Sequence, residues 1–439
     1  MRGLLLLCAA GPDPSGPMIL ESRWGAPKLT TVLIVILSII FLLWVVRFVD
    51  CLKLRHQDPF LTADPAAAVP SPAPFVSVLV PARNESVNIR RTLGALLSQN
   101  YPAFEVIVAD DRSEDDTPRI LREFADRDPR VRLLEFHDLP AGWTGKNHVL
   151  WESARHARGE ILLFLDADTT LDPGALSVLA SYFIENRLDM LSPLIRSEHG
   201  FFWEQVLGPI AVTALMLRFP LQKVNDPKSP VAFAAGQALM IRADVYHAVG
   251  GHRSIRSFLL EDMALARLVK NRGYRLRLVY GFNLAVTQMF SSLGRFYTGW
   301  TRIFYCALQG NVLRLFAGAL FLVIFSLMPY ATLAFAGLRL ALGSGDSRTV
   351  LLLVMSLVQI AVMMSLMAWL IRMGRGTTRY IVLHLPACLI VTAIFFSAIA
   401  VHFSKSITWK GMAYDVHAEK LDLLPDVPEP PQREKPEAR

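Results

Sequence analysis

An uncharged run, TVLIVILSIIFLLWVV over residues 31–46, constrains this chain more than any other feature. With its flanks it reaches the roughly 20 apolar residues that a helix needs to cross a lipid bilayer. Three further apolar stretches follow late in the chain, at about 315–338, 350–371 and 380–403. The middle of the chain, about 74–285, is instead charged and mixed in pattern. We therefore expect one aqueous domain between membrane anchors.

This organisation predicts a division of the chain into successive segments. We expect an N-terminal segment (1–30), a transmembrane helix (31–49), a linker (50–74), a cytoplasmic domain (75–312), a membrane domain of about three helices (313–403) and a C-terminal tail that is disordered at its end (404–439). The hydrophobic share of the composition, 53%, supports the membrane segments because it is high for a water-soluble chain of 439 residues. The linker is rich in Ala and Pro, and the end of the tail is rich in Pro and charge.

Basic residues near the membrane segments favour a cytoplasmic aqueous domain. Arg47, Lys53 and Arg55 follow the first span closely, whereas only Arg23 and Lys28 stand shortly before it. The densest basic loop, within 372–379, falls on the same side when the later spans are counted from a cytoplasmic domain. Three crossings after that domain would put the tail on the far side of the membrane.

The net charge and the cysteines restrict the partners further. The net charge is +7, but basic and acidic residues are interleaved in the middle domain, so we expect no nucleic-acid partner and assign the charge to contact with anionic lipid. The four cysteines, Cys8, Cys51, Cys306 and Cys388, are far apart and lack metal-ligand spacing. Their scarcity in the aqueous domain fits a reducing compartment.

Short apolar strands alternate with helical segments in the middle domain. The expected strands are FVSVLVPARNE, with its end at Pro81, then FEVIVADD, VRLLEF and EILLFLDADT. The expected helices cover residues 88–99 and 149–156. Strands and helices that alternate at this spacing predict βαβ units and a mostly parallel sheet, which is an α/β fold.

Two acidic pairs follow two of these strands, Asp110 with Asp111 and Asp166 with Asp168. Either pair alone could be a turn or a helix cap. Because both stand at corresponding strand ends, a divalent ion between them is favoured, and Mg²⁺ or Mn²⁺ prefers such oxygen ligands together with phosphate. The glycine motifs of dinucleotide-binding folds and of P-loops are absent from the sequence. The remaining candidate ligand is a nucleotide sugar, with its diphosphate bound to a metal ion.

The segments SVLVPARNE, VIVADDRSEDDT, GWTGKNHVL, FLDADT and LLEDMALARLVKNRGYRLRL, in this order, resemble the family-2 inverting glycosyltransferases. The resemblance covers about residues 75–310 and implies a nucleotide-sugar-binding fold of the GT-A type. VNDPKSPVAFAAGQALMIRADVYHAVGGH and GWTR are similar to the membrane-anchored subgroup of ceramide, hopanoid-associated and carotenoid glycosyltransferases.

The resemblance implies a role for each candidate site residue. Asp262 is the implied catalytic base, and Asp166 and Asp168 are the implied metal ligands. The implied nucleotide-sugar-binding residues are Pro81, Arg83, Glu85, Asp110, Asp111, Lys146 and Asp166. The implied acceptor-side residues are Gly236, Gln237, Glu261 and Trp300.

Each of these roles has a simpler alternative. The alternative role of Asp262 is electrostatic stabilisation of a helix N-terminus, with no part in catalysis. Lys146 could be an exposed loop lysine, as most lysines are. Gly236 could belong to a simple turn, and Trp300 could be an interfacial tryptophan of the membrane.

Three further segments remain open at this stage. Processive members of the family carry Q-x-x-R-W where this chain has RFYTGWTR, which favours the addition of one sugar per acceptor. ITWKGMAYD at 407–415 is similar to a C-terminal element of the same subgroup, and a role near the site would require one of the late apolar stretches to be re-entrant. The segment 201–221 is either a core helix or a helix in the headgroup plane.

The expected function is the transfer of a single sugar from a nucleotide-diphosphate sugar, UDP-linked by preference, to a membrane lipid such as a hopanoid, carotenoid or ceramide. The expected cofactor is Mg²⁺ or Mn²⁺, and the expected location is the bacterial cytoplasmic (inner) membrane. Two alternatives are a non-catalytic membrane scaffold and a membrane-bound sugar nucleotidyltransferase. The donor sugar, the acceptor lipid and the oligomeric state are open.

Overall fold

The computed structural model describes residues 26–54, 60–198, 201–409 and 412–415. The chain divides into two compact units, and each is described here by itself. The first unit contains the chain up to Val45 together with Pro329–Ala361, and the second contains Val46–Met328 and the chain from Val362 onward.

Apolar helices make up the first unit: most of α1 (Ala26–Leu54), α13 (Met328–Ala341) and the first half of α14 (Ser347–Met373). Polar side chains link them, since Arg339 Nη1 donates to Thr30 Oγ1 at 3.0 Å and the hydroxyls of Thr332 and Ser356 lie 2.8 Å apart. Large apolar side chains on their outer surface are exposed, such as Leu42 at 62%. Apolar exposure on this scale is typical of a lipid-facing surface.

Among the residues that the structure describes, four helical segments are long and apolar enough to cross a membrane. They are Lys28–Val46, Val312–Ala341, Ser347–Met373 and Ile381–Ser404. The prediction of an α/β domain with additional membrane helices is thereby confirmed for the helices. The N-terminal segment up to residue 25 and the tail from residue 416 lie outside the described residues.

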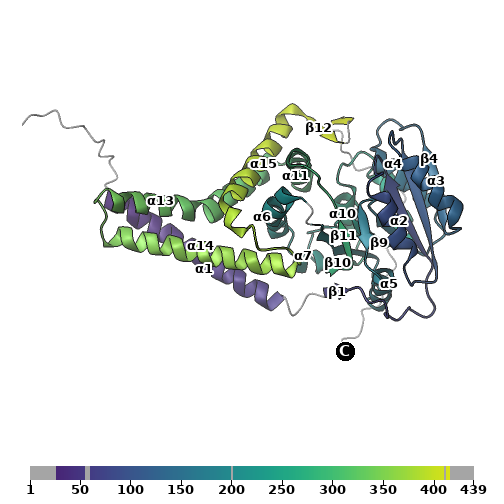
Figure 1. Cartoon of the computed structure of the whole chain (residues 1–439), viewed down its shortest axis with the longest axis horizontal. Helices are drawn as coiled ribbons and strands as arrows, with labels where there is room; N and C mark the ends of the chain where they lie inside the picture. The colour runs from purple at the N-terminus through teal and green to yellow at the C-terminus, as the bar shows by residue number, and fades with distance from the viewer. Residues whose placement is uncertain (1–25, 55–59, 199–200, 410–411, 416–439) are drawn as a thin grey trace, which may run out of the picture. The chain divides into compact units, whose positions relative to one another are not determined.

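An eight-stranded sheet forms the centre of the second unit (Figure 1). Its strands, in sheet order, are β1 (Phe60–Thr62), β10 (Leu276–Asn283), β7 (Met190–Leu194), β9 (Ala238–Arg242), β5 (Ile161–Leu165), β2 (Val76–Ala82), β3 (Phe104–Asp111) and β4 (Val131–Phe136). Neighbouring strands are parallel except at β9, which is antiparallel to β5 and to β7. The prediction of a mostly parallel sheet is confirmed.

Helices cover both faces of this sheet. One apolar layer packs α2 (Ile89–Leu97), α3 (Thr117–Arg127) and α5 (Ala175–Glu185) against it. The layer on the other face contains α4 (Gly145–His156), α6 (Phe202–Arg218), α10 (Glu261–Asn271) and α11 (Leu293–Ala307). Because β3 and β5 are buried along their whole length, both are mainly apolar up to the acidic residues at their ends. The exception is Glu105 in β3, whose buried carboxylate pairs with Arg158 at 2.8 Å.

The remaining elements are short or connect the layers. They are β6 (Thr169–Leu171), β8 (Arg196–Ser197), β11 (Ala285–Thr287), β12 (Ser406–Trp409), β13 (Met412–Asp415), α7 (Leu221–Asn225), α8 (Ala243–Ala248), α9 (Gly251–Ser254), α12 (Val312–Leu322), η1 (Val323–Leu327), η2 (Ile381–Leu383) and α15 (His384–Ser404). β6, β11 and β8 form a small sheet, and β12 and β13 form a hairpin.

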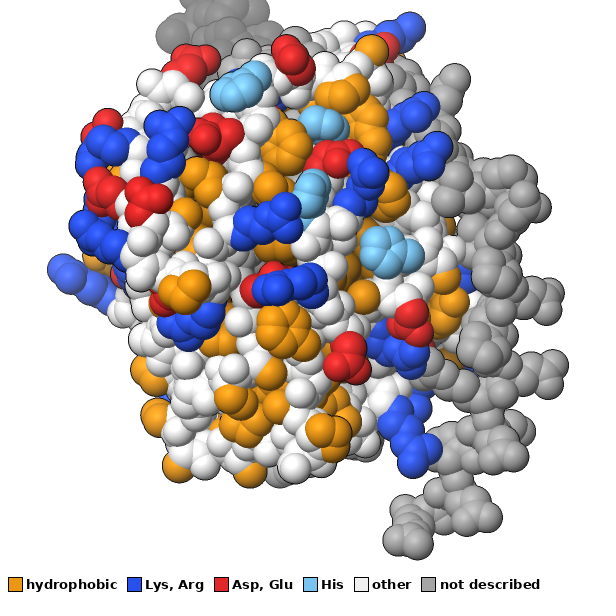
Figure 2. Space-filling view, turned by 90° about the vertical axis from the view of Figure 1, so that its right-hand side faces the viewer, with side chains coloured by type: hydrophobic (Ala, Val, Ile, Leu, Met, Phe, Trp, Pro, Cys, Tyr) orange, Lys and Arg blue, Asp and Glu red, His pale blue; other side chains and the backbone are white. Residues whose placement is uncertain are grey.

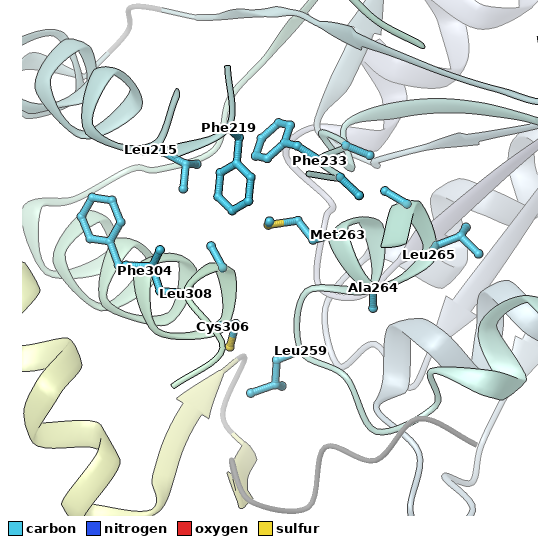
Figure 3. Packing of buried hydrophobic residues seen from close by; sticks show 14 of the residues in the cluster. Leu215, Phe219, Phe233, Leu259, Met263, Ala264, Leu265, Phe304, Cys306 and Leu308 are labelled. Carbon is cyan, nitrogen blue, oxygen red and sulfur yellow. The ribbon is translucent and has the colours of Figure 1, made fainter. Parts of the chain in front are cut away.

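Helices α6, α10 and α11 meet in an apolar cluster next to the sheet (Figure 3). Met263 of α10 points toward Phe219, while Phe304 and Cys306 project from α11 in the same view (Figure 3). α6 buries Leu207 and Ala211 but exposes Val212, at 48%. The helix is therefore partly a core helix, and its placement in the headgroup plane stays a prediction.

Two local predictions differ from the structure. α4 begins at Gly145 instead of residue 149, because Thr144 Oγ1 accepts a hydrogen bond from the Asn147 N–H at 3.4 Å and caps the helix earlier. Lys146 therefore stands in the first turn of a helix and not in a loop. Part of the expected linker forms β1, which pairs in parallel with β10 at the edge of the sheet.

Candidate active site

A pocket lies where the carboxyl ends of the central strands meet the start of α10, and it holds about 290 Å³ of empty space. Its lining residues are Pro81, Lys146, Leu150, Phe164, Leu165, Asp166, Gly236, Leu239, His252, Glu261, Asp262 and Leu265. The carboxyl ends of strands are where open α/β sheets place their ligands. The structure thus brings together six of the residues predicted from the sequence: Pro81, Lys146, Asp166, Gly236, Glu261 and Asp262.

Lys146 forms two short ion pairs across this pocket. Its Nζ atom lies 2.6 Å from Asp166 Oδ1 and 2.5 Å from Glu261 Oε1. Burial alone would lower the pKa of Lys146, but the two carboxylates outweigh burial and raise it above its usual range. In the same way Lys146 overcomes the effect of burial on Glu261 and lowers the pKa of that carboxyl. Lys146 and Glu261 are therefore both charged at neutral pH.

Asp262 differs from its neighbour Glu261, whose carboxylate forms an ion pair with Lys146. Burial, followed by the negative charge of Glu261, raises the pKa of Asp262 to about 7. Its Oδ1 atom accepts a hydrogen bond from the Met263 N–H at 2.7 Å. A Cβ atom on Gly236 would lie 3.0 Å from Asp262 Oδ2, so a glycine backbone forms the wall against this carboxylate. A carboxyl that titrates near neutral pH suits a general base.

The acidic pair at the end of β3 lies two strands from β5, with β2 between them. At the usual strand spacing this is about 9–10 Å. Asp111 pairs with Arg112 at 2.8 Å and more distantly with Arg83 at 3.9 Å. Asp110 is 5% exposed, and burial raises its pKa although it accepts a hydrogen bond from the Ser113 N–H at 3.3 Å.

The N-terminus of α4 connects the two acidic sites. Lys146 contacts Asp166, and a Cβ atom on the preceding Gly145 would lie 2.1 Å from Asp111 Oδ2, so only glycine fits there. The side chain of Asn147 donates to the carbonyls of Ile255 at 2.8 Å, Arg256 at 3.1 Å and Phe258 at 3.0 Å. The positive end of a helix favours anions, so this region suits a diphosphate.

The residues after β5 fit a divalent metal ion. Asp166 and Asp168, which are separated by one residue, supply carboxylate oxygens. The Thr287 hydroxyl donates a hydrogen bond to Asp168 Oδ1 at 3.1 Å and orients that carboxylate. Within the described part of the chain, no group of three or more His, Cys, Asp and Glu side chains is arranged to hold an ion alone. Mg²⁺ and Mn²⁺ commonly take one or two carboxylates and complete their shell with water and diphosphate oxygens, so this donor set is suitable for them.

His252 also lines the pocket, although the sequence predicted no role for it. Its Nδ1 atom lies 2.8 Å from the Tyr246 hydroxyl, and burial lowers its pKa to about 3, so the imidazole is neutral. The signal in the sequence was the Gly-Gly pair that precedes it. Gly251 has a φ of +49°, and the Tyr246 ring occupies the space that a Cβ atom would need. The apolar lining residues Leu150, Phe164, Leu239 and Leu265 carry no signal that separates them from ordinary core positions.

Some predicted residues lie beside the pocket lining. The Gln237 carbonyl accepts from the Asp166 N–H at 3.1 Å, and its side chain donates to Met289 Sδ at 3.4 Å. Glu85 accepts from Asn88 at 3.1 Å at the start of α2. Trp300 is 5% exposed and packs between Phe296 and Phe304 in α11. Their predicted roles, like those of the pocket residues, stay predictions.

The mostly parallel sheet, with acidic side chains at the ends of β3 and β5 and a helix N-terminus between them, forms a GT-A-like α/β domain. Residues 77–250 match the model of a family described as glycosyl transferase family 2. The resemblance to the family-2 glycosyltransferases that the sequence indicates is confirmed over these residues, which are less than half of the chain.

Curated relatives and solved structures are similar to this chain over a larger part of its length. The 4,4'-diaponeurosporenoate glycosyltransferase of Staphylococcus aureus strains USA300 and NCTC 8325 is 25% identical over 231 residues, which are 52% of this chain and 60% of the relative. The chain therefore spans about 60% of the length of these relatives.

Among solved structures, a mannosyltransferase from Pyrobaculum calidifontis in complex with GDP-Man and Mn²⁺ is 19% identical with a TM-score of 0.48, over 85% of this chain and 99% of that one. Residues 1–349 of S. aureus TarS in complex with UDP-GlcNAc are 14% identical with a TM-score of 0.39, over 77% of this chain and 95% of that one.

Proposed function

We propose that this chain is an inverting glycosyltransferase that moves one sugar from a nucleotide-diphosphate sugar, UDP-linked by preference, to a hydroxyl or carboxyl group of a membrane lipid. The observation that carries the proposal is Asp262, a carboxyl with a pKa of about 7 beside the Lys146–Asp166–Glu261 cluster. The family-2 domain over residues 77–250 supports the same reaction class.

Asp262 acts in this proposal as the general base. Inversion at the anomeric carbon requires the acceptor to attack from the face opposite the leaving diphosphate. A carboxylate within hydrogen-bond reach of the acceptor hydroxyl takes its proton, which contributes roughly 10²–10⁴ in rate. Gly236 allows the backbone to approach Asp262 closely and keeps the carboxylate directed into the pocket.

The donor is held by the groups at the ends of β2, β3 and β5. Asp110 and Asp111 bind the nucleoside, and Lys146 with the N-terminus of α4 binds the diphosphate. Asp166 and Asp168 would hold Mg²⁺ or Mn²⁺, which offsets negative charge on the leaving diphosphate. Lys146 lies between Asp166 and Glu261 and offsets one of their two negative charges, which reduces the repulsion that a diphosphate meets.

The acceptor reaches the site from the bilayer. The four apolar helical segments keep the chain at the membrane, and a lipid then arrives by lateral diffusion. The S. aureus relatives are named for the glycosylation of 4,4'-diaponeurosporenoate, and we extend from this to an acceptor of the carotenoid or hopanoid kind. We place the catalytic domain on the cytoplasmic side of a bacterial inner membrane, as the basic residues after the first span favour.

The surface of the catalytic domain agrees with a lipid acceptor better than with nucleic acid. Figure 2 shows basic and acidic side chains interspersed with apolar ones over one face of the molecule. A nucleic-acid site would instead gather positive charge in one stripe.

The proposal is tested with the purified full-length chain in detergent, a panel of labelled nucleotide sugars and extracted membrane lipids. We expect a labelled lipid and a free nucleoside diphosphate as products, and we expect Asp262→Asn to abolish both. Asp126→Asn is the matched control, since Asp126 is exposed on α3 and should leave transfer unchanged. Release of pyrophosphate would identify a nucleotidyltransferase instead, and absence of turnover with every donor would favour a scaffold.

A further inference from the structure

The C-terminal hairpin packs on the catalytic domain although it follows the last apolar helix. In the hairpin Ile407 pairs with Tyr414, and Trp409 pairs with Met412. Ile407 is 6% exposed within the apolar cluster that also contains α10 and α11. The rings of Trp409 and Tyr414 lie 6.3 Å apart and pack against the same cluster. The hairpin thus packs against the catalytic domain, and its place on the same side of the membrane as that domain stays a prediction.

Tyr414 faces the charged groups at the end of β3. Its hydroxyl oxygen is shut off from solvent. The carboxylate of Asp111 and the guanidinium groups of Arg83 and Arg112 act on it, and the Gly145 N–H lies close to it. Burial, followed by the charge of Asp111, raises the pKa of Tyr414, so the hydroxyl is neutral and able to donate and accept hydrogen bonds.

Trp409 is linked to the segment that leads into α10. The guanidinium carbon of Arg302 in α11 lies 4.8 Å from the centroid of the Trp409 ring, which is a cation–π contact. Nη1 of the same arginine donates to the Leu259 carbonyl at 2.8 Å. Leu259 is 2% exposed and precedes Glu261 by two positions. Arg302 therefore holds the hairpin and the start of α10 together.

These contacts join two motifs that the proposed reaction leaves unused, GWTR in α11 and the aromatic residues of the hairpin. Arg302 ties the hairpin to the segment before α10, and Tyr414 of the hairpin lies near the end of β3, where the proposed function places the nucleoside. An aromatic ring beside a carboxylate and arginine side chains is a suitable set of groups for a nucleobase and its ribose, because the ring offers a stacking surface and the polar groups offer hydrogen bonds.

We propose that the hairpin β12–β13 is part of the nucleotide-binding site, with Tyr414 forming the wall over the base and ribose of a nucleoside diphosphate. Arg302 and Trp409 are positioning residues that fix this wall relative to α10. The inference rests on the proposed function, and it extends the donor site from the domain at 75–312 to a segment beyond the membrane helices.

The test measures UDP binding to the full-length chain in detergent by calorimetry, with Mn²⁺ present. Tyr414→Phe keeps the ring but loses the hydroxyl, and the loss of one hydrogen bond should raise the UDP dissociation constant about two- to ten-fold. Tyr414→Ala also loses the stacking surface and should raise it by about ten-fold or more. The donor KM should rise in parallel, whereas kcat at saturating donor and the acceptor KM should stay near the wild-type values.

Two further sets of variants separate binding from general structural damage. Tyr182→Phe on α5 removes the same hydroxyl on the opposite layer of the sheet, and it should leave UDP binding unchanged. Arg302→Met should lower kcat and weaken UDP binding together, because it releases both Trp409 and the Leu259 carbonyl, and Arg302→Lys should restore part of both. Melting temperatures of all variants identify any that are unfolded.

Unchanged or tighter UDP binding in Tyr414→Phe and Tyr414→Ala would overturn the inference, and if the wild type also transfers sugar, the proposed function would survive. A wild type that binds UDP through Tyr414 but transfers no sugar would support the nucleotide site and remove the proposed function. A wild type that binds neither UDP nor GDP would overturn both.

Discussion

Gly236→Ala tests whether the position of Asp262 controls the reaction. The added Cβ atom would lie 3.0 Å from Asp262 Oδ2 and 3.3 Å from Asp262 Cγ. Because a Cβ atom and a non-bonded carboxylate atom prefer a separation of about 3.5 Å or more, the Asp262 carboxylate must move by roughly 0.4 Å. A misplacement of about 1 Å costs on the order of 10²-fold in rate, so a shift of this size corresponds to roughly a six-fold loss of kcat.

The assay follows nucleoside diphosphate release with donor and acceptor both saturating, so that kcat is measured separately from the two KM values. Gly94→Ala is the matched control, since a Cβ atom at this α2 position has nothing within 4 Å. It should leave kcat unchanged and stabilise the helix by about 0.5–1 kcal/mol. A wild-type kcat in Gly236→Ala, or an equal loss in both variants, would refute the assignment of Asp262 as a positioned base.

Four other predictions concern the charges and the expected metal ion of the site. Lys146→Met leaves Asp166 and Glu261 without a cation and should lower the free energy of unfolding in detergent by roughly 3 kcal/mol, the low end for a broken buried pair because the lysine side chain keeps 19% exposure. The value of kcat/KM should fall as the pH drops through about 7, because protonated Asp262 cannot accept a proton. Glu261→Gln removes the negative charge that helps to raise the pKa of Asp262, so the midpoint of its pH profile should move to lower pH. Chelation of divalent ions should abolish transfer and added Mn²⁺ should restore it, with Asp168→Asn requiring more Mn²⁺ than the wild type.

The sequence was most informative where local pattern decides the structure. The apolar runs that become β2, β3 and β5 are short, bounded by turns and buried on both faces, and such runs identify parallel strands. Because the acidic residues follow these runs directly, their position at one edge of the sheet could be predicted as well. The proximity of Lys146 to Asp166 and Glu261 was implied only by the family resemblance, since these residues are far apart in the chain.

Long-range pairing could not be predicted in the same way. The direction of β9 between β5 and β7 depends on the path of the chain through α6 and α7, and an apolar strand has the same pattern in either direction. Strand β1 is short, and its pairing with the distant β10 has no local signal. His252 resembles a surface residue in the sequence and becomes a pocket residue only because α9 returns toward α10.

The three hydrogen bonds from the Asn147 side chain have a consequence for the efficiency of the enzyme. They bind the first turn of α4 to the loop before α10, so the proposed phosphate-binding residue Lys146 and the proposed base Asp262 stand on two helices that are directly joined. This connection disfavours a state in which the sugar donor is bound but the general base is misplaced. In such a state water could hydrolyse the donor. We therefore expect that the loss of these Asn147 hydrogen bonds would raise the hydrolysis of the sugar nucleotide before it lowered the rate of transfer.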